Sequence, residues 1–306
     1  MANRAPTLDS KVFTIDDLRD LGSKKLPKMV REYYNEGGMD MITLRDNEQA
    51  FNRYKIRPRI LVNVEGVDTS STIFGTKVSF PLGFSPTAMH KLAHPEGELA
   101  TSRAAAKAGI CMGLSSYATT SLEDVVAQSS GNPYVMQMCV LKNRGITLQL
   151  LKRAEAAGYK ALFLSVDTPT LGRRLNEMRN NFTLPPELDL PNILSSGAAI
   201  GKSEGADSDT AYVTHPEDIL LAIRYQCDGI VISNHGGRQL DGQPATLDAL
   251  RDCAPYAAGK IPIVLDGGIR RGSDIFKALA LGATHCFVGR IPIWGLAVGP
   301  ISFSAP

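Results

Sequence analysis

The sequence predicts an α/β fold: a (β/α)₈ TIM barrel preceded by a helical N-terminal cover. Apolar segments of strand length alternate with helical segments from residue 81 onward, which is typical of parallel βαβ units. Nearly every strand ends in polar residues or glycines, and a barrel builds its site at the carboxyl ends of its strands. A doubly wound sheet would alternate in the same way, but it would carry a Gly-x-Gly-x-x-Gly motif after its first strand. No such motif follows residues 81–85, so the barrel is favoured.

Composition narrows the class of protein. The 306 residues are 43% hydrophobic and 21% charged, which fits one domain of barrel size. We expect a single domain over 1–306, with the cover at 1–80 and the barrel at 81–300. The net charge of +2 without runs of like charge indicates no nucleic-acid or membrane partner. Five scattered cysteines without ligand spacing favour a reducing compartment and predict no metal site. Because no apolar leader or spanning segment occurs, we expect a soluble intracellular protein without a signal peptide.

The first 80 residues are predicted to be mainly helical. Thr14 followed by Asp16 and Asp17 is typical of a helix start, and helical structure is expected over 14–50. Apolar residues at helical spacing over Lys24–Glu36 include the pair Tyr33 and Tyr34, which on such a helix is usually core packing. Residues 57–80 have no strong period and predict a small cover with short strands.

The barrel elements are placed by their apolar periodicity. The predicted strands are Pro81–Ser85, Ile110–Ser115, Tyr134–Val140, Ala161–Val166, Gly229–Ser233, Pro262–Leu265 and His285–Val288. The predicted helices are Glu96–Ala108, Leu122–Gln128, Ile146–Ala157, Pro216–Tyr225, Leu247–Cys253 and Ser273–Leu281. The polar residues at the strand ends are Ser85-Pro86-Thr87, Ser115-Ser116, Gln137, Ser165 with Asp167, Ser233-Asn234-His235, Asp266-Gly267-Gly268 and Gly289-Arg290.

The strand end around His235 is the strongest candidate for chemistry. A buried apolar strand delivers His235 and Arg238 at its carboxyl end, a common way to build an active site. Taken alone, the two residues fit a loop histidine and a surface arginine equally well. Asp167, at another strand end, is placed to orient His235 and to stabilise its protonated form. Arg174 and Arg238 lie on different loops, where they could grip a carboxylate in bidentate geometry, although Arg174 alone fits a structural role equally well.

The last two strands predict a phosphate site. Asp266-Gly267-Gly268-Ile269-Arg270 follows one strand and Gly289-Arg290 follows the next. Glycines let backbone N–H groups approach phosphate oxygens, and loops after the last two strands are the usual phosphate position in barrels. The alternative is that these glycines only form tight turns. The pattern indicates a phosphorylated ligand without naming it.

Together these stretches resemble the FMN-dependent α-hydroxy acid oxidases and dehydrogenases, such as glycolate oxidase, lactate oxidase and the flavin domain of flavocytochrome b2. The chain is also similar to fungal members used in secondary metabolism. The resemblance covers residues 10 to 297. The matching stretches are Lys25–Val30 with Tyr33-Tyr34, Arg57–Leu61, Pro86–Met89, Ala93–Glu98, Leu114–Ser116, Val166–Pro169, Ser233–Asp241 and Leu265–Ala283.

The resemblance implies a role for each candidate residue. His235 would be the base, paired with Asp167, and Tyr33, Arg174 and Arg238 would bind a small 2-hydroxy acid. Oxygen or another acceptor would take the electrons from FMN, the implied cofactor. The flavin ring would contact Pro86, Thr87, Ala88, Ser115, Gln137, Ser165 and Ser233, and the ribityl phosphate would contact Asp266, Gly267, Gly268, Ile269, Arg270, Gly289 and Arg290.

The chain departs from the family pattern in three places. Cys139 stands where the family has a second active-site tyrosine. Between Arg174 and Ser233 the chain is too short for one β/α unit, and no lysine occurs from Ser203 to Gly259, where the family places one beside the flavin. The sequence therefore predicts seven strands where a barrel needs eight. Residues after Trp294 do not look like the family's closing helices, so we expect exposed apolar strand surface there.

Two other classes of function compete with this interpretation. A catalytically impaired homologue would bind FMN, a phosphate ligand or a partner without turnover. An isomerase or aldolase on a phosphate-binding barrel would not explain why Arg174, His235 and Arg238 occur together. Relatives are commonly tetramers, so a homo-oligomer is expected, in the cytoplasm or the peroxisome. The tail Ser304-Ala305-Pro306 is not a peroxisomal signal.

Overall fold

The computed structural model describes residues 11–167, 170–193 and 214–299. Within them, seven parallel strands form a nearly closed barrel in the order β6-β5-β4-β3-β9-β8-β7. In this part of the chain β6 and β7 are the two ends of the sheet and do not pair with each other, in agreement with the predicted loss of one strand. The strands are β3 Leu82–Phe84, β4 Cys111–Leu114, β5 Tyr134–Met138, β6 Ala161–Leu164, β7 Ile230–Ile232, β8 Ile263–Asp266 and β9 His285–Val288.

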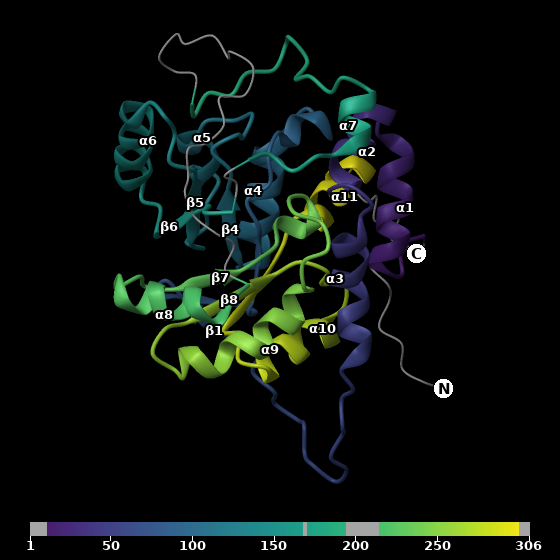
Figure 1. Ribbon diagram of the computed structural model, residues 1–306, viewed down its shortest axis with the longest axis vertical. Coiled ribbons are helices and arrows are strands. Elements are labelled where there is room, and N and C mark those ends of the chain that lie inside the picture. Colours follow the sequence, from purple (N-terminus) through teal and green to yellow (C-terminus); the bar gives the residue numbers. More distant parts are fainter. Residues whose placement is uncertain (1–10, 168–169, 194–213, 300–306) are drawn as a thin grey trace.

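Helices follow the strands and surround them, as the alternation predicts (Figure 1). Most predicted boundaries hold within two residues, but α9 runs on past Pro255 to Ala257. Glycines in the left-handed conformation, Gly109 and Gly158, end α4 and α6. The barrel helices are α4 Gly97–Ala108, α5 Leu122–Val126, α6 Arg144–Ala157, α8 Pro216–Arg224, α9 Thr246–Ala257, α10 Gly272–Ala280 and α11 Arg290–Val298, with a short α7 at Leu175–Arg179.

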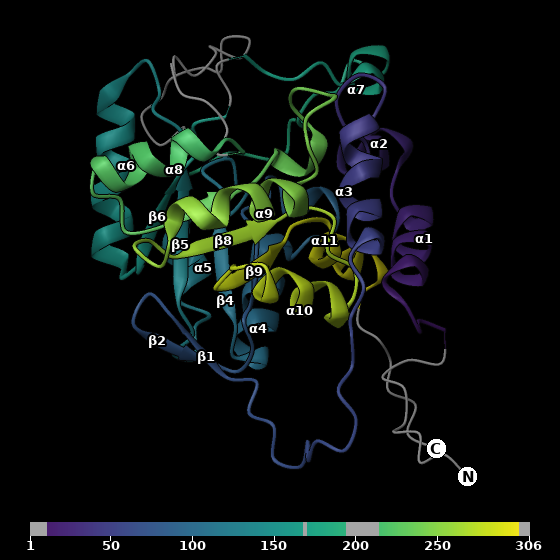
Figure 2. The same ribbon diagram turned by 60° about the horizontal axis from the view of Figure 1, so that its bottom comes forward.

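The N-terminal cover consists of three helices where the sequence predicted helical structure over 14–50. They are α1 Ile15–Lys25, α2 Lys28–Asn35 and α3 Ile42–Arg53. Thr14 and Asp17 form the reciprocal capping box of α1. α1 and α11 lie side by side (Figures 1 and 2). Gly22 makes this approach possible, because a Cβ there would lie 2.7 Å from the carbonyl oxygen of Trp294.

A hairpin of β1 Ser71–Ile73 and β2 Thr76–Val78 fulfils the prediction of short strands before the barrel. Ile73 and Val78 join a buried cluster with Val135, Phe287 and other barrel residues. The hairpin lies at the amino ends of the strands, since the backbone N–H that follows it, at Ser79, donates to Gly109 just before β4. The carboxyl ends are left for the site.

The region after β9 differs from the sequence expectation. All four residues of β9 are buried, and α11 follows directly with Ile293 and Trp294 in the core. The expected exposure of strand surface therefore does not occur at β9. It occurs at β6, where Leu162 and Leu164 are 44% and 52% exposed. In the described part of the chain, no helix is long and apolar enough to cross a membrane.

Candidate active site

The loops after β6 and β7, the two end strands of the sheet, place His235 against Asp167. His235 follows β7 and Asp167 follows β6, and His235 Nδ1 lies 2.9 Å from Asp167 Oδ2. The carboxylate is largely buried, with 12% of its side chain exposed, whereas 41% of the imidazole is exposed. A carboxylate at Nδ1 orients the ring, so Nε2 is the nitrogen available for proton transfer.

The loop that carries His235 is held by helix α3 of the cover. Asn47 and Asn234 donate their amide N–H groups to each other's carbonyl oxygens, at 2.8 and 2.9 Å, and both side chains are buried. The backbone N–H of Gly237 also donates to Asn234. A Cβ on Gly237 would lie 2.6 Å from the backbone nitrogen of Leu44, so only glycine allows this contact. The cover thus belongs to the site rather than merely lying over it.

The three residues expected to bind a carboxylate come together beside this loop. The Arg238 guanidinium lies over the Tyr33 ring at 4.9 Å and donates to the Tyr33 carbonyl oxygen. Glu177, which the sequence analysis did not single out, lies between the two arginines, 3.4 Å from Arg174 and 3.2 Å from Arg238. Burial, and then Arg174, lowers the pKa of Arg238. The i,i+3 spacing of Arg174 and Glu177 was the available sequence signal.

Polar side chains line the strand ends on the β4–β6 side. The Gln137 amide donates to Ser165 at 2.9 Å and accepts from the Ser115 hydroxyl at 3.3 Å. The same amide group lies 3.5 Å from Cys139 Sγ. Burial, and then Asp167, raises the pKa of the Cys139 thiol. These predicted residues therefore form one network around a single amide.

The segment Pro86-Thr87-Ala88, at the end of β3, is fixed from the cover. The Tyr34 hydroxyl donates to the backbone carbonyl oxygens of Ala88 and Met89, at 3.2 and 2.8 Å. A Cβ on Gly289, at the end of β9, would lie 3.2 Å from Thr87 Oγ1. Thr87, a candidate for the flavin ring at the end of β3, therefore lies next to Gly289, a candidate for the phosphate at the end of β9.

Asp266 is the buried acid at the end of β8. Its Oδ2 accepts from the Ser85 hydroxyl at 3.2 Å, and Ser233 also hydrogen-bonds to it. Its Oδ1 is buried without a partner in the described residues, and burial raises the pKa of the carboxyl group. Gly267 and Gly268 follow with φ of 95° and 76°, values that favour glycine.

Arg270 and Arg290 line a cavity of about 440 Å³, together with Arg19 and Glu48 of the cover. Arg290 donates to the carbonyl oxygens of Tyr34, Gly236 and Glu36, at 2.8 to 3.1 Å. Burial and then nearby arginines lower its pKa to about 9. Arg270 Nε is buried without a partner among the described residues. The Ile269 side chain lies in the core, so only its backbone faces the site.

The residues present fit FMN. The unpartnered Asp266 Oδ1 is an acceptor suited to a ribityl hydroxyl, and the unpartnered Arg270 Nε is a donor suited to a phosphate oxygen. Both are buried, and a buried polar group without a partner is destabilising until a ligand satisfies it. Among the described residues no cluster of histidine, cysteine or acidic side chains could hold a metal ion.

A family model for FMN-dependent dehydrogenases matches residues 22–210 and 212–300. The chain belongs to this family. It is 50% identical to oxidase FUB9 of Fusarium oxysporum f. sp. lycopersici, over 94% of this chain and 81% of that protein. It is 43% identical to glycolate oxidase of Spinacia oleracea, over 94% of this chain and 85% of the relative. The solved structure of mandelate oxidase with (S)-4-hydroxymandelic acid superimposes with a TM-score of 0.87 at 33% identity, over 94% of this chain and 88% of the other.

The comparisons also agree with the predicted missing segment. The FMN-dependent dehydrogenase match is interrupted at residue 211, where the sequence predicted the loss of a β/α unit. The match to FUB9 extends over 315 residues, more than the 306 of this chain, so that relative contains residues that this chain lacks. Residues 194–213, Thr168, Pro169 and the tail 300–306 lie outside the described residues, so the structure does not test what was expected of them.

Proposed function

We propose that the chain oxidises a small 2-hydroxy acid to the 2-oxo acid, with FMN as its first electron acceptor. The observation that carries the proposal is the contact between His235 and Asp167 beside the paired Arg174 and Arg238. A carboxylate anchor and a base at adjacent strand ends match the two ends of a 2-hydroxy acid. The cover (1–80) and barrel (81–300) are proposed to act as one domain, because Asn47 and Tyr34 reach into the site.

In this mechanism the arginines bind and His235 moves the proton. Arg174 and Arg238 hold the substrate carboxylate, and Glu177 keeps the two like charges together. His235 Nε2 takes a proton from the substrate, and Asp167 stabilises the imidazolium that results. Tyr33 is buried and packs under Arg238, beside the proposed position of the substrate carboxylate. When bound, FMN supplies the two-electron redox chemistry that no side chain provides.

FMN itself is proposed to lie across the strand ends. Its ring would contact Pro86–Ala88, Ser115, Gln137, Ser165 and Ser233, and Asp266 would accept from the ribityl chain. The phosphate would be held by Gly267, Gly268, Arg270, Gly289 and Arg290, with the Ile269 backbone adjacent. Asp266 Oδ1 and Arg270 Nε, which are among the buried atoms without a partner in the described residues, support this placement.

A catalytically impaired homologue is the second candidate. It is favoured by the absence of lysine from Ser203 to Gly259 and by the unpaired edges of β6 and β7. A positive charge beside the flavin would stabilise its reduced anionic form, so without one a slower reduction is expected. Cys139, in place of the family tyrosine, also removes a hydroxyl from the site.

The test is anaerobic bleaching of the FMN absorbance by a panel of 2-hydroxy acids. Bleaching should occur, and His235→Ala should slow it by roughly 10²- to 10⁴-fold, the usual contribution of a positioned base. His215→Ala is the control histidine, since the His215 side chain caps α8 through the Glu217 backbone N–H, and its loss should leave the rate unchanged. FMN binding without bleaching by any acid would favour the impaired homologue, and bleaching unaffected by His235→Ala would exclude the proposed base.

Acceptor, assembly and location are further proposals that rest on the family resemblance. Oxygen or another acceptor would reoxidise FMN, the chain would form a homo-oligomer, and it would act in the cytoplasm or the peroxisome. Oxygen consumption, light scattering and cell fractionation test the three proposals separately.

A further inference from the structure

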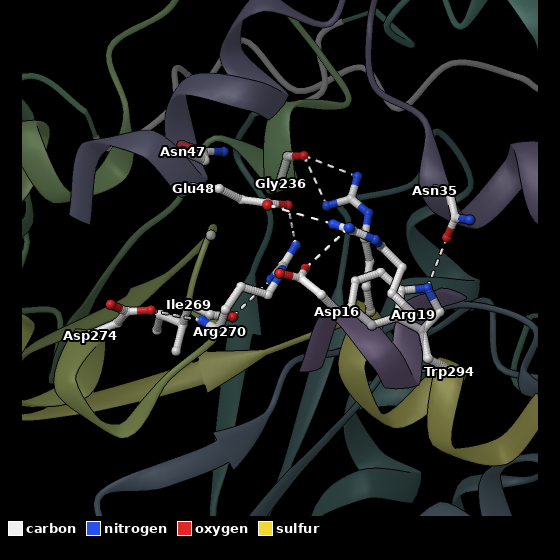
Figure 3. Close-up of polar contacts among 12 residues, drawn as sticks. Asp16, Arg19, Asn35, Asn47, Glu48, Gly236, Ile269, Arg270, Asp274 and Trp294 are labelled. Carbon is white, nitrogen blue, oxygen red and sulfur yellow. Dashed lines mark hydrogen bonds and ion pairs between the residues drawn. The ribbon is translucent and has the colours of Figure 1, made fainter. Parts of the chain in front are cut away.

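Glu48, on α3 of the cover, lies against the arginine of the phosphate loop (Figure 3). Its Oε1 accepts from Arg270 Nη2 at 2.6 Å. Arg270 Nη1 donates to the Ile269 carbonyl oxygen at 2.8 Å, and the guanidinium lies over the Trp294 ring at 5.1 Å. The guanidinium is therefore held in one orientation, while Arg270 Nε stays without a partner among the described residues.

Glu48 holds one of the two nitrogens that a phosphate would need. A guanidinium binds an oxyanion best with two parallel hydrogen bonds, and one such edge is formed by Nε and Nη2. Arg270 gives Nη2 to Glu48 and leaves Nε unused. A phosphate that takes both donors would come against the Glu48 carboxylate, which already accepts from Nη2. The two anions would then lie in contact in a largely buried place, which is unfavourable.

A second arginine lies close enough to Glu48 to pair with the displaced carboxylate. Arg19, on α1, places Nη1 3.8 Å from Glu48 Oε2, and its Nη2 lies 3.1 Å from Asp16. Figure 3 shows the Glu48 carboxylate between the guanidinium groups of Arg19 and Arg270. A small rotation of the side chain therefore exchanges one arginine partner for the other.

We propose that Glu48 is a built-in competitor for the FMN phosphate: it occupies Arg270 in the flavin-free protein and moves to Arg19 when the phosphate binds. The proposal rests on the proposed function, because it takes FMN as the ligand. It predicts that changes at Glu48 alter the affinity for flavins that carry the phosphate and leave the affinity for flavins without it unchanged. The reason is that, among the described residues, Glu48 contacts none of those placed around the flavin ring.

The experiment compares FMN with riboflavin, which lacks the phosphate, on the flavin-free full-length protein. Binding is measured by the change in flavin fluorescence. Glu48→Gln keeps the shape of the side chain and removes its charge, so FMN should bind about tenfold more tightly, the effect expected for one charge-assisted hydrogen bond. Riboflavin binding should not change. Asp46→Asn is the matched control, because Asp46 lies on the same helix, carries the same charge and pairs with Arg53.

A double-mutant cycle tests the second partner. Arg19→Gln should weaken FMN binding in the parent protein. The same substitution should weaken FMN binding less in the Glu48→Gln variant, because that variant has no displaced carboxylate for Arg19 to bind. Unchanged or weaker FMN binding in Glu48→Gln, or an equal change for riboflavin, would overturn the inference and leave the proposed function standing. A parent protein and a Glu48→Gln variant that both fail to bind FMN would overturn the two proposals together.

Discussion

The two sides of the open barrel differ in how well their strands are covered. On one side, β9 is buried at all four residues, and Leu265 of β8 is fully buried. On the other side, β6 alternates between partly buried and exposed residues, with Leu164 52% exposed. The covered side carries the proposed phosphate-binding residues, and β6 leads to Asp167.

The gap in the barrel lies between β6 and β7. It therefore also lies between the proposed base, which follows β7, and its carboxylate partner, which follows β6. His235 follows β7 and Asp167 follows β6, the two strands that do not pair. Their loops are joined instead by Gln239, which donates to the carbonyl oxygen of Asp167 at 3.3 Å and accepts from the backbone N–H of Gly172 at 3.0 Å. Side-chain hydrogen bonds at the rim thus take over the alignment that strand pairing gives elsewhere in the sheet.

The largest expected effect contrasts two leucines on the two sides. Leu265→Ala removes a fully buried side chain from β8 and should lower the free energy of unfolding by about 2–5 kcal/mol. Leu164→Ala, at a half-exposed position of β6, should lower it by less than about 1 kcal/mol. Urea unfolding of both variants measures the two values. Equal losses would mean that the β6 side is covered as well as the β8 side.

The next effect concerns the residue that joins the two loops. Gln239→Ala removes hydrogen bonds to both loops, so His235 and Asp167 should lose their alignment and flavin reduction should slow by about tenfold or more. Gln243→Ala is the control, because Gln243 lies in the same loop and its Oε1 has no partner in the described residues. Stopped-flow flavin reduction measures both variants. A Gln239→Ala rate equal to that of the control would mean that the sheet alone aligns the pair.

The smallest effect tests the buried acid on the covered side. Burial raises the pKa of Asp266 in the folded protein, so its stabilising contribution is present at low pH and lost as the pH rises through the raised pKa. Asp266→Asn should therefore stabilise the flavin-free protein at pH 7 by about 1 kcal/mol, with no gain near pH 3, while weakening FMN binding. Thermal unfolding at the two pH values measures the difference. A destabilised variant at pH 7 would show that the charged form is favoured in the fold.

Local sequence patterns were sufficient for the barrel, and they placed the candidate residues at its strand ends. Strand and helix periods, the capping residues around Thr14 and the glycines at Gly267 and Gly268 act over a few residues, and they appear in the structure as predicted. The seven strands and the contact between His235 and Asp167 also agree with the sequence, because parallel strands bring their carboxyl ends to one rim.

Tertiary structure decided which charges meet. Glu177 between Arg174 and Arg238, and Glu48 at Arg270, join residues from 3 to 222 positions apart. Only the Arg174–Glu177 pair has a local i,i+3 spacing, and no local period encodes the two longer-range pairs, since a charged residue on a helix is normally a solvated one. The helix after β9 was also missed, because its residues are buried only by packing against α1, α2 and α4, which come from distant parts of the chain. Sequence alone thus determined the barrel and the strand ends at which the candidate residues lie. The folded chain determined how the site is held together, because burial and long-range contacts exist only after the segments are assembled.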